Sequence, residues 1–384
     1  MLSLIKTTEE LKSFCLEAGK YPYVTIDTEF IRDKSYYAKL CLIQIAFPGD
    51  GKNDSTIIDP CEHDLSLEPF YDLLRKQSVI KVFHAARQDL EIFFTTAGVI
   101  PDPLFDTQVA AMVCGFGVQV AYETLVNKIL NKRLDKSSRF TDWAIRPLSS
   151  SQINYALSDV THLRKIYEFL NNELLEDNRF TWVKEEMDIL RNPKTYLVEP
   201  DEAWKKIRLR QKDPDFVKIV KALAIFREKE AQKRDVPRGH IIKDDEILRL
   251  ASSKPKKLQD LNNSRLLSKS TKTGWIANGV MEALKNSDKI LIEPFNEPNH
   301  IPLSAEQEAL IDLLRLLLKL KSSIHNVAVK LIASAKDLEM IARHKEPKVR
   351  AIEGWRYEIF GEDALRLKNG EISLSFDKNG LCIK

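Results

Sequence analysis

Apolar and polar positions change their period along the chain, and this change separates an N-terminal α/β region from the helical regions that follow. Short runs rich in β-branched and aromatic residues, bounded by Gly, Asp, Asn or Pro, predict strands. Apolar residues spaced three and four apart predict helices. We expect strands at Tyr23–Thr28, Lys39–Phe47, Thr56–Asp59 and Lys81–His84. We expect helices at Thr8–Ala18, Leu65–Lys76, Asp89–Ala97, Asp106–Cys114, Ala121–Leu130 and Ser150–Asn172.

The order of these elements predicts the class of fold. Ten residues separate the first two strands, which favours antiparallel pairing between them. Helices then alternate with the remaining strands, a pattern typical of a mixed sheet with helices on both faces. We therefore expect an α/β domain at residues 1–190.

Strand signals end after this region. Residues 191–203 contain two prolines and no helical period, so we expect them to form a linker. Residues 204–286 predict four or five helices, with breaks at 236–239, near Pro255 and near Gly274. We expect these residues to form an all-α domain.

A turn-rich stretch, IEPFNEPNHIP, precedes a second helical region that we expect at residues 300–384. Its tail contains Lys-Asn-Gly at 368–370 and again at 378–380. Asn-Gly favours the tight turns of β-hairpins. We therefore expect one or two helical domains after the α/β domain, with a small hairpin near Lys384.

The composition is that of an ordinary globular protein, with 43% apolar and 30% charged residues in a chain of 384. No apolar run approaches the roughly 18 residues that cross a membrane, and the N-terminus lacks a basic-then-apolar signal pattern. The five cysteines are far apart and never form a CxxC pair, which disfavours a disulfide framework and a zinc site. We expect a cytoplasmic protein with no membrane partner.

Charge is distributed unevenly along the chain. The net charge is only +3, but residues 205–257 contain 17 Lys and Arg against 8 Asp and Glu, so the remainder has a net charge of −6. A basic segment attached to an acidic body is typical of proteins that bind a polyanion. A solvated, lysine-rich helical surface or a protein-docking surface explains the same excess.

Carboxylates adjoin apolar runs, and buried acids are costly unless a cation compensates them. Asp27 and Glu29 end the run YVTIDTEF, and residues two apart on a strand face the same side. Both side chains can then enter one cleft at the carboxyl end of the strand, while Thr28 turns away. Hard oxygen ligands of this kind suit Mg²⁺. A turn or a helix cap explains the same pattern, so this pair alone does not establish a metal site.

Three further residues are candidates for the same site. Asp89 follows a second apolar run in KVFHAARQDLEIF, where it either binds a metal or interacts with the dipole at a helix N-terminus. Tyr155 and Asp159 lie four apart in SQINYALSDVTHL and therefore share a helix face. Asp159 can bind a metal there while Tyr155 reaches the same cleft. Alternatively, Tyr155 is a buried aromatic residue and Asp159 is exposed.

The motifs become specific when they are taken in order. The chain contains DTEF, SYYAKLCLIQIA, FHAARQDLEIF, LFDTQVAAM and SSRFTDWAIRPLSSSQINYALSDVTHL. Together they resemble the ribonuclease D family, the DEDD exonucleases whose third motif is Tyr-x-x-x-Asp. The later sequences WKKIRLRQ and AIFREKEAQKRDVPRGHIIKDDEI resemble the helicase-and-RNase-D C-terminal (HRDC) domain. The resemblance covers residues 1–285 and is thinner from 290 onward, where the family often has a second such domain.

The resemblance implies a fold, a cofactor and a set of site residues. The fold is a ribonuclease H-like mixed sheet flanked by helices, followed by one or two all-α HRDC-type domains. The cofactor is a pair of divalent metal ions, Mg²⁺ or Mn²⁺. The implied metal ligands are Asp27, Glu29, Asp89 and Asp159, and Tyr155 would orient the attacking water. The residues expected to contact substrate are Phe30, Gln44, His84, Arg139 and Arg146.

The implied function is a 3′→5′ exoribonuclease that releases nucleoside 5′-monophosphates. Its RNA partner would be a transfer-RNA precursor, or another structured RNA with a single-stranded 3′ end. One alternative is a 3′→5′ DNA exonuclease of the same superfamily, with identical active-site chemistry. Another is a non-catalytic RNA-binding protein, but its signature would be a lost acid, and all the acids are present. The chain has no glycine-rich phosphate loop, which disfavours a nucleotide-binding protein of that type.

Overall fold

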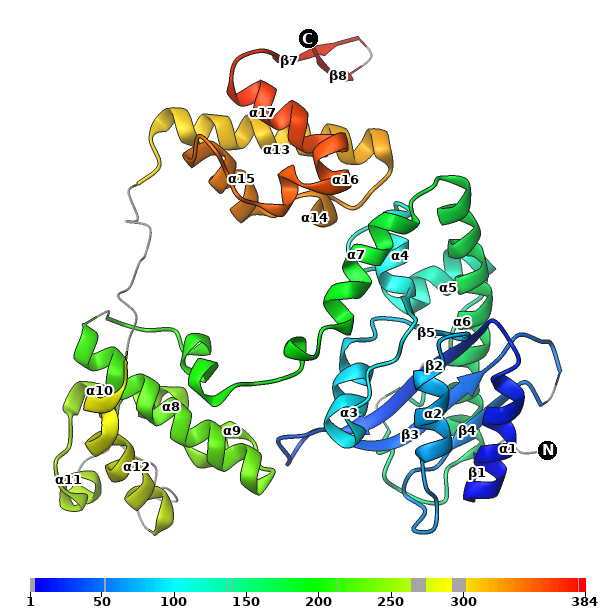
Figure 1. The fold of residues 1–384 in the computed structure, drawn as a ribbon, viewed down its shortest axis with the longest axis horizontal. Helices are drawn as coiled ribbons and strands as arrows, with labels where there is room; N and C mark the ends of the chain where they lie inside the picture. Colours follow the sequence, from blue (N-terminus) through cyan, green and yellow to red (C-terminus); the bar gives the residue numbers. More distant parts are fainter. Residues whose placement is uncertain are drawn as a thin grey trace.

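A computed structural model describes residues 4–51, 53–135, 137–139, 141–211, 213–263, 274–291, 302–378 and 380–384. The chain forms an α/β part followed by two sets of helices (Figure 1). In the described residues, no helix is both long enough and apolar enough to cross a membrane.

The α/β part is built on a six-stranded sheet with the order β1-β4-β3-β2-β5-β6. The strands are β1 (Leu4–Ile5), β2 (Tyr23–Ile31), β3 (Lys39–Ala46), β4 (Ser55–Ile58), β5 (Ile80–Phe83) and β6 (Leu104–Asp106). β3 is antiparallel to β2 and β4, whereas the pairs β1–β4, β2–β5 and β5–β6 are parallel. The expected mixed sheet and the antiparallel first pair are therefore confirmed.

One strand boundary differs from the expectation in a way that affects the site. β2 continues to Ile31 instead of ending at Thr28, and a bulge interrupts its pairing with β3 between Glu29 and Phe30. Asp27 and Glu29 therefore lie within the strand and not at its carboxyl end. The pattern ended the strand too early because the polar residues that follow Ile26 break the apolar run.

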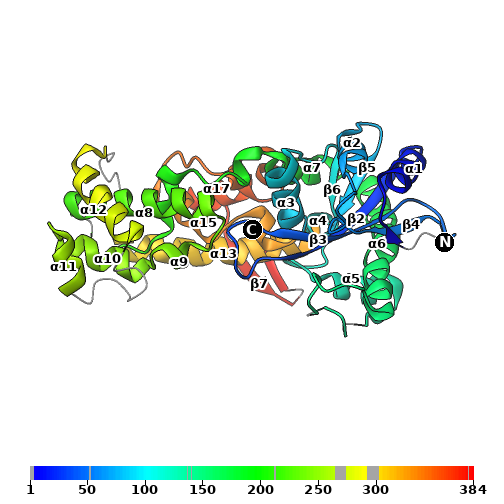
Figure 2. The same ribbon diagram turned by 90° about the horizontal axis from the view of Figure 1, so that it is seen from below.

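Helices cover both faces of the sheet, with α1, α2 and α3 on one side and α5 and α6 on the other (Figures 1 and 2). The helices are α1 (Thr8–Ala18), α2 (Glu68–Arg75), α3 (Arg87–Ala97), α4 (Thr107–Val113), α5 (Tyr122–Leu130), α6 (Ser150–Glu176) and α7 (Phe180–Arg191). α6 packs against β2, β3 and β4. Its start is defined by a capping box between Ser149 and Gln152. The sequence pattern identified all of these helices except α7.

The first helical set follows two short 3₁₀ turns, Pro193–Thr195 and Pro200–Lys206, so ordered turns occupy most of the expected linker. Its helices are α8 (Pro214–Arg234), α9 (Arg238–Ile241), α10 (Asp244–Ser253), α11 (Leu258–Asn263) and α12 (Trp275–Asn286). They surround a hydrophobic core of their own. The first expected break, at 236–239, is confirmed only in part, because α9 already begins at Arg238. The break near Pro255 is confirmed, whereas residues 264–273, just before the third break, lie outside the described residues.

The second helical set packs on the α/β part. Its elements are α13 (Ala305–His325), α14 (Val329–Ile332), α15 (Ala335–Arg343), α16 (Gly354–Arg356), α17 (Glu362–Lys368), β7 (Leu374–Asp377) and β8 (Gly380–Ile383). The rings of Trp182 on α7 and Trp355 on α16 stack with their centroids 4.4 Å apart. The backbone N–H of Ala328 donates to the carbonyl of Met112 at 2.9 Å. The buried apolar residues of this set therefore belong to the same core as the sheet.

The expected terminal hairpin is confirmed, since β7 pairs antiparallel with β8. Asn379, in its expected turn, lies outside the described residues. The other Lys-Asn-Gly sequence does not form a hairpin. It ends α17 instead, where Gly370 has a φ of +75° that suits glycine.

Candidate active site

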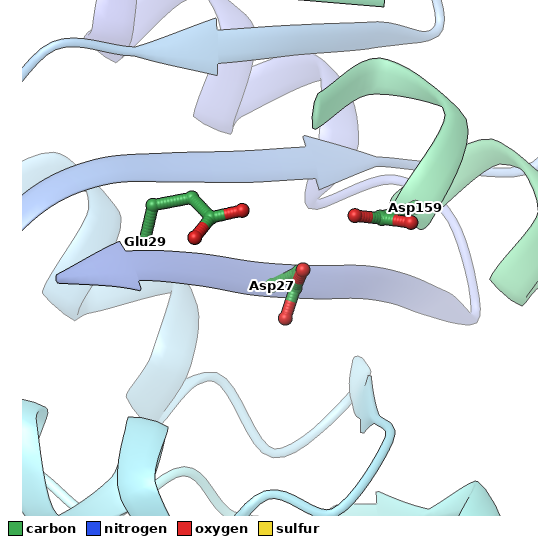
Figure 3. Close-up of side chains that lie close together, drawn as sticks. All are labelled: Asp27, Glu29 and Asp159. Carbon is green, nitrogen blue, oxygen red and sulfur yellow. The ribbon is translucent and has the colours of Figure 1, made fainter. Parts of the chain in front are cut away.

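Three carboxylates meet beside the middle of the sheet. Asp27 and Glu29 project from β2, and Asp159 comes from α6, the helix that crosses this strand (Figure 3). One carboxylate oxygen from each residue lies within 4.8 Å of the other two. Two residues spaced two apart on a strand and one residue on the covering helix thus converge, although 130 residues separate Glu29 from Asp159 in the sequence.

Tyr155 lies one helical turn before Asp159 on α6 and faces the same cleft. Its hydroxyl interacts with the Asp159 carboxylate and lowers the pKa of that group. Tyr122, at the start of α5, donates from its hydroxyl to the backbone carbonyl of Asp159. The two tyrosines hold Asp159 from both its side chain and its backbone, so the orientation of this carboxylate is well defined.

The pKa values of these carboxylates are raised first by burial, and the charges of neighbouring acids add to the rise for Asp27 and Glu29. Burial, and then the charges of Asp27, Asp159 and Asp89, raise the pKa of Glu29 to about 9. Burial raises the pKa of Asp159 to about 7, although the Tyr155 hydrogen bond and the charge of Arg139 oppose this rise. Burial and the charge of Asp159 also hold the pKa of Asp27 well above its usual range.

Asp89 lies in the first turn of α3, next to this group but outside the set of three. Its carboxylate accepts a hydrogen bond from the Thr28 hydroxyl. We expected Thr28 only to turn away from the cleft, but its hydroxyl instead holds the carboxylate of Asp89. Burial, and then the charge of Asp27, raise the pKa of Asp89 well above its usual range.

The turn that leads into α3 is held by Asp106. Its carboxylate accepts the backbone N–H groups of Ala85 at 3.0 Å and Ala86 at 2.8 Å, and it also caps α4. Ala85 has a φ of +59°, which is uncommon for a residue with a side chain. Asp106 therefore fixes the turn that aims Asp89 at the sheet. Asp106 lies in the motif LFDTQVAAM, but the sequence alone assigned it no role.

A cavity of about 200 Å³ opens beside the three carboxylates. Its polar lining includes Asp27, His84, Tyr122, Glu123, Arg139, Tyr155 and Asp159. The structure thus brings two of the expected substrate contacts, His84 and Arg139, to the same cleft as the acids. Tyr122 was missed by the sequence analysis, since a lone tyrosine at a helix start gives no signal until the helix is placed.

Comparisons with known proteins agree with this geometry. A model of the 3′-5′ exonuclease family matches residues 2–175, and one of the HRDC domain matches residues 217–273. Ribonuclease D of Jannaschia sp. is 51% identical over 375 residues, covering 97% of this chain and 96% of the relative. Ribonuclease D of Granulibacter bethesdensis is 43% identical, covering 98% of this chain and 94% of the relative.

The chain belongs to the ribonuclease D family. It is accordingly a hydrolase of the 3′–5′ exoribonuclease class. The crystal structure of Escherichia coli RNase D superposes with a TM-score of 0.81 at 26% identity, covering 96% of this chain and 99% of that one. The mixed sheet with flanking helices and the helical C-terminal region are therefore the fold of this family.

The donor set of this ribonuclease D family member suits divalent metal ions. Three carboxylates with raised pKa values converge, and among the described residues Arg139 is the cation that lowers the pKa of Glu29 and Asp159. Hard oxygen ligands are those that Mg²⁺ and Mn²⁺ prefer. A bound cation would lower the pKa of each acid and remove the cost of burying them together. The family and the acidic group thus both indicate divalent metal ions.

The other expected substrate contacts lie away from the cavity. Phe30 packs against the hydrophobic core. Gln44 is fully buried opposite Asp27 on β3, and its side-chain amide has no hydrogen-bond partner among the described residues. Arg146 is held by Asp59, to which its Nη2 donates at 2.7 Å, and by a Trp143 carbonyl. The Arg146 guanidinium is thus occupied within the protein.

His84 is held at the edge of the cavity by Thr107. Its Nδ1 lies 3.0 Å from the Thr107 hydroxyl oxygen, and that hydroxyl donates to the carbonyl of Phe83 at 3.0 Å. Because the hydroxyl proton is used in this way, we assign Nδ1 as the donor. Burial lowers the pKa of His84, which favours the neutral ring.

Proposed function

We propose that this ribonuclease D family member removes nucleotides from the 3′ end of RNA and releases them as 5′-monophosphates, using two divalent ions. The observation that carries the proposal is the convergence of Asp27, Glu29 and Asp159 within 4.8 Å, beside a cavity that Tyr155 also lines. Asp89 would complete the ligand set for the second ion. We propose Mg²⁺ or Mn²⁺, because the donors are all hard oxygens.

The protein's own groups would position the substrate and the attacking water. When bound, the two metal ions would lower the pKa of water and stabilise the leaving 3′ oxygen. The carboxylates of Asp27, Glu29, Asp89 and Asp159 would hold that charge in place. The hydroxyl of Tyr155 would orient the water. Burial raises the pKa of Tyr155, so this residue acts as a neutral donor and not as a base.

Arg139 supplies positive charge to the described lining of the cavity. It lines the cavity, and its charge lowers the pKa of both Glu29 and Asp159. A guanidinium at this position would attract the phosphate of the terminal nucleotide as well. We therefore keep Arg139 and His84 as proposed substrate contacts.

The helical parts would bind the body of the RNA. We propose that residues 204–286 form an HRDC-type nucleic-acid-binding domain and that residues 300–384 form a second, diverged one, separated from the exonuclease domain (1–190) by the linker 191–203. The two sets share an order of helix lengths: 21, 4 and 10 residues in α8–α10 and 21, 4 and 9 in α13–α15. This common order supports duplication of one helical unit.

The physiological substrate would be a transfer-RNA precursor or another small, stable RNA. The Escherichia coli RNase D structure is described as an exoribonuclease involved in structured RNA processing, which supports a structured RNA with a single-stranded 3′ end. A basic helical segment that contacts phosphates would hold such an RNA without reading its sequence.

The decisive test uses 5′-labelled RNA with an unpaired 3′ tail beside a DNA of the same sequence, each incubated with the protein and Mg²⁺. EDTA and the Asp27→Asn protein are the controls. We expect a ladder with one-nucleotide steps on RNA, lost in both controls. An equal ladder on DNA would indicate a general or DNA-directed exonuclease. RNA binding in a gel shift without any ladder would indicate a non-catalytic binder.

A further inference from the structure

A groove of about 480 Å³ lies between the α/β part and the first helical set and shares no lining residue with the catalytic cavity. One wall comes from the residues that follow β2 and from the start of α3, including Arg32 and Arg87. The opposite wall comes from the second 3₁₀ turn and α9, with Lys206 and Arg238. Tyr196, from the linker, forms the floor between them.

The groove is basic. Its lining contains four cationic residues and two acids, Asp33 and Glu91. Arg32 pairs with Glu91 at 2.7 Å, and Arg238 pairs with the fully buried Glu228 at 2.5 Å. By contrast, Arg87 and Lys206 form no ion pair with any of the residues that the structure describes. Two of the four cations are therefore available to an anion.

The basic surface continues beyond this groove onto the first helical set. A second cavity, of about 550 Å³, shares Lys206 and Arg238 with the groove and adds Arg227 and Lys243. Within it, Arg227 pairs with Asp244 at 2.5 Å. The two cavities together form a continuous path from α3 to the start of α10. Such a path suits an extended polyanion better than a single small anion.

The path begins close to the catalytic residues. Arg32 follows Glu29 by three residues along extended chain, a distance of about 10 Å at roughly 3.3 Å per residue. Arg87 precedes Asp89 by two residues on α3. Burial raises the pKa of Tyr196, the charge of Arg87 lowers it, and the charge of Asp89 adds to the rise. The groove and the catalytic acids therefore lie within electrostatic range of each other.

The loop between β2 and β3 reaches toward α8 and α9 (Figure 1). One tyrosine of this loop, Tyr36, connects the two walls of the groove. Tyr36 is buried in the core of the first helical set and donates from its hydroxyl to Glu228. Arg238 donates to the same hydroxyl oxygen at 2.9 Å. Asp235 accepts the backbone N–H groups of Tyr36 and Tyr37, both at 2.9 Å. These contacts make the groove a built feature of the fold.

We propose that this interdomain groove binds the phosphates of the RNA immediately 5′ of the nucleotides being removed, with Arg87 and Lys206 as the principal contacts. This inference rests on the proposed function and specifies where the body of the substrate is held. Phosphate contacts from these side chains would bind any RNA sequence and would weaken as salt is added.

The test compares Arg87→Gln, Lys206→Gln and the double variant with Lys12→Gln, a matched change on the exposed face of α1 at the other end of the molecule (Figure 2). KM is measured on RNAs with long and short single-stranded 3′ tails at several salt concentrations. RNA binding is measured by fluorescence anisotropy in an Asp27→Asn background. Lys206 lies outside α3, so its variant separates RNA binding from any effect on Asp89.

For long RNA, we expect each substitution to raise KM about threefold to tenfold and to reduce the slope of log affinity against log salt by about 0.7. Lys12→Gln should change neither quantity, and the loss should shrink as the tail is shortened. An unchanged KM and salt slope in the double variant would overturn the proposal, as would an equal loss on a dinucleotide. If the unsubstituted protein cleaves no RNA, the proposed function fails, while anisotropy still decides the groove.

Discussion

At the scale of single residues, the site is a group of acids that the folded chain holds together at a cost. Asp27, Glu29 and Asp159 share one small space, and each has a raised pKa because burial disfavours the charged form; the charges of neighbouring acids add to the rise for Asp27 and Glu29. Arg139 offsets only part of this cost. The site is therefore complementary to a positive charge, and its residues should behave as a unit.

Shared ligation predicts that catalytic losses do not add. Asp27→Asn and Asp159→Asn should each lower kcat about a thousandfold, equivalent to several kcal/mol of lost transition-state stabilisation. The double variant should be little worse than either single one, because one substitution already disrupts the metal site. Steady-state kinetics on a labelled RNA measures this. Multiplicative losses would mean that the two acids act independently.

The raised pKa values predict how stability depends on pH when no metal is bound. An unfolded glutamic acid ionises near pH 4.3, whereas folded Glu29 keeps its proton up to a pKa of about 9. Ionisation therefore favours the unfolded state across this window, and the free energy of unfolding falls as pH rises. In EDTA, Tm should decline from about pH 5 to pH 9.

Glu29→Gln should flatten that decline, and Mg²⁺ should raise Tm more at pH 8 than at pH 5. The control is Glu17→Gln, an exposed change on α1 that should follow the unsubstituted protein. Thermal denaturation at each pH provides the measurement. If Tm in EDTA rises from pH 5 to pH 9, the carboxylates are not held together as described.

Tyr155 also acts as a single residue of the site, but its role differs from that of the carboxylates. Because its hydroxyl hydrogen-bonds Asp159 and lines the cavity, Tyr155→Phe should lower kcat about a hundredfold while KM and Tm change little. Kinetics and thermal denaturation of the same preparation separate the two effects. A loss confined to Tm would make Tyr155 a structural residue only.

At the scale of elements, loops and helix starts bring the acids to the sheet. The bulge in β2 follows Glu29, α6 starts at a capping box and carries Asp159, and α3 starts at a turn held by Asp106. Phe30, Ser149, Gln152 and Asp106, which form these features, do not belong to the described lining of the catalytic cavity. Each fixes the direction of a helix or strand that carries an acid.

Substitution of Asp106 tests whether the turn before α3 is held as described. Asp106→Ala would leave the buried N–H group of Ala86 and the partly buried one of Ala85 without their acceptor, so we expect a loss of about 2 kcal/mol in the free energy of unfolding. Asp135→Ala removes a comparable but exposed hydrogen bond, to the N–H of Ser137, and should cost well under about 1 kcal/mol. Urea denaturation compares them. Equal losses would show that Asp106 has no special role in holding the turn.

At the scale of the whole molecule, the two helical sets are attached by different chemistry. The second set shares an apolar core with the sheet, and Arg356 adds a pair with Glu185 at 2.7 Å. The first set is joined through polar contacts around Tyr36 and through the linker. The first set should therefore detach from the sheet more readily than the second.

Tyr36→Phe tests this attachment. Losing a hydrogen bond to a charged group costs about 1.5 kcal/mol, so detachment of the first helical set should become about tenfold more populated. Limited proteolysis within residues 191–211 should accelerate to a similar extent. Tyr37→Phe, at the more exposed neighbouring position, is the control. Equal cleavage of both variants would indicate that the Tyr36 hydroxyl does not hold the domain.

Local patterns in the sequence predicted most of the helices and strands but not the residues at which they begin and end. The long, periodic helices α1, α6, α8 and α13 are recognisable because apolar spacing and capping residues act within one segment. β1 and β6 were missed, since two or three residues carry no period. α7 was missed because no side chain caps its start, so the sequence carries no start signal for it.

The sequence by itself determined the α/β class, the helical C-terminal half, the five candidate catalytic residues and the family, because side-chain chemistry and short spacing are properties of the chain alone. Only the tertiary structure decided which of those side chains meet. It brought Asp159 to Asp27 and Glu29, assigned Arg146 to Asp59, and used Tyr36 to join the first helical set to the α/β part. Such contacts depend on long-range packing, in which burial and the direction of each backbone select the partners.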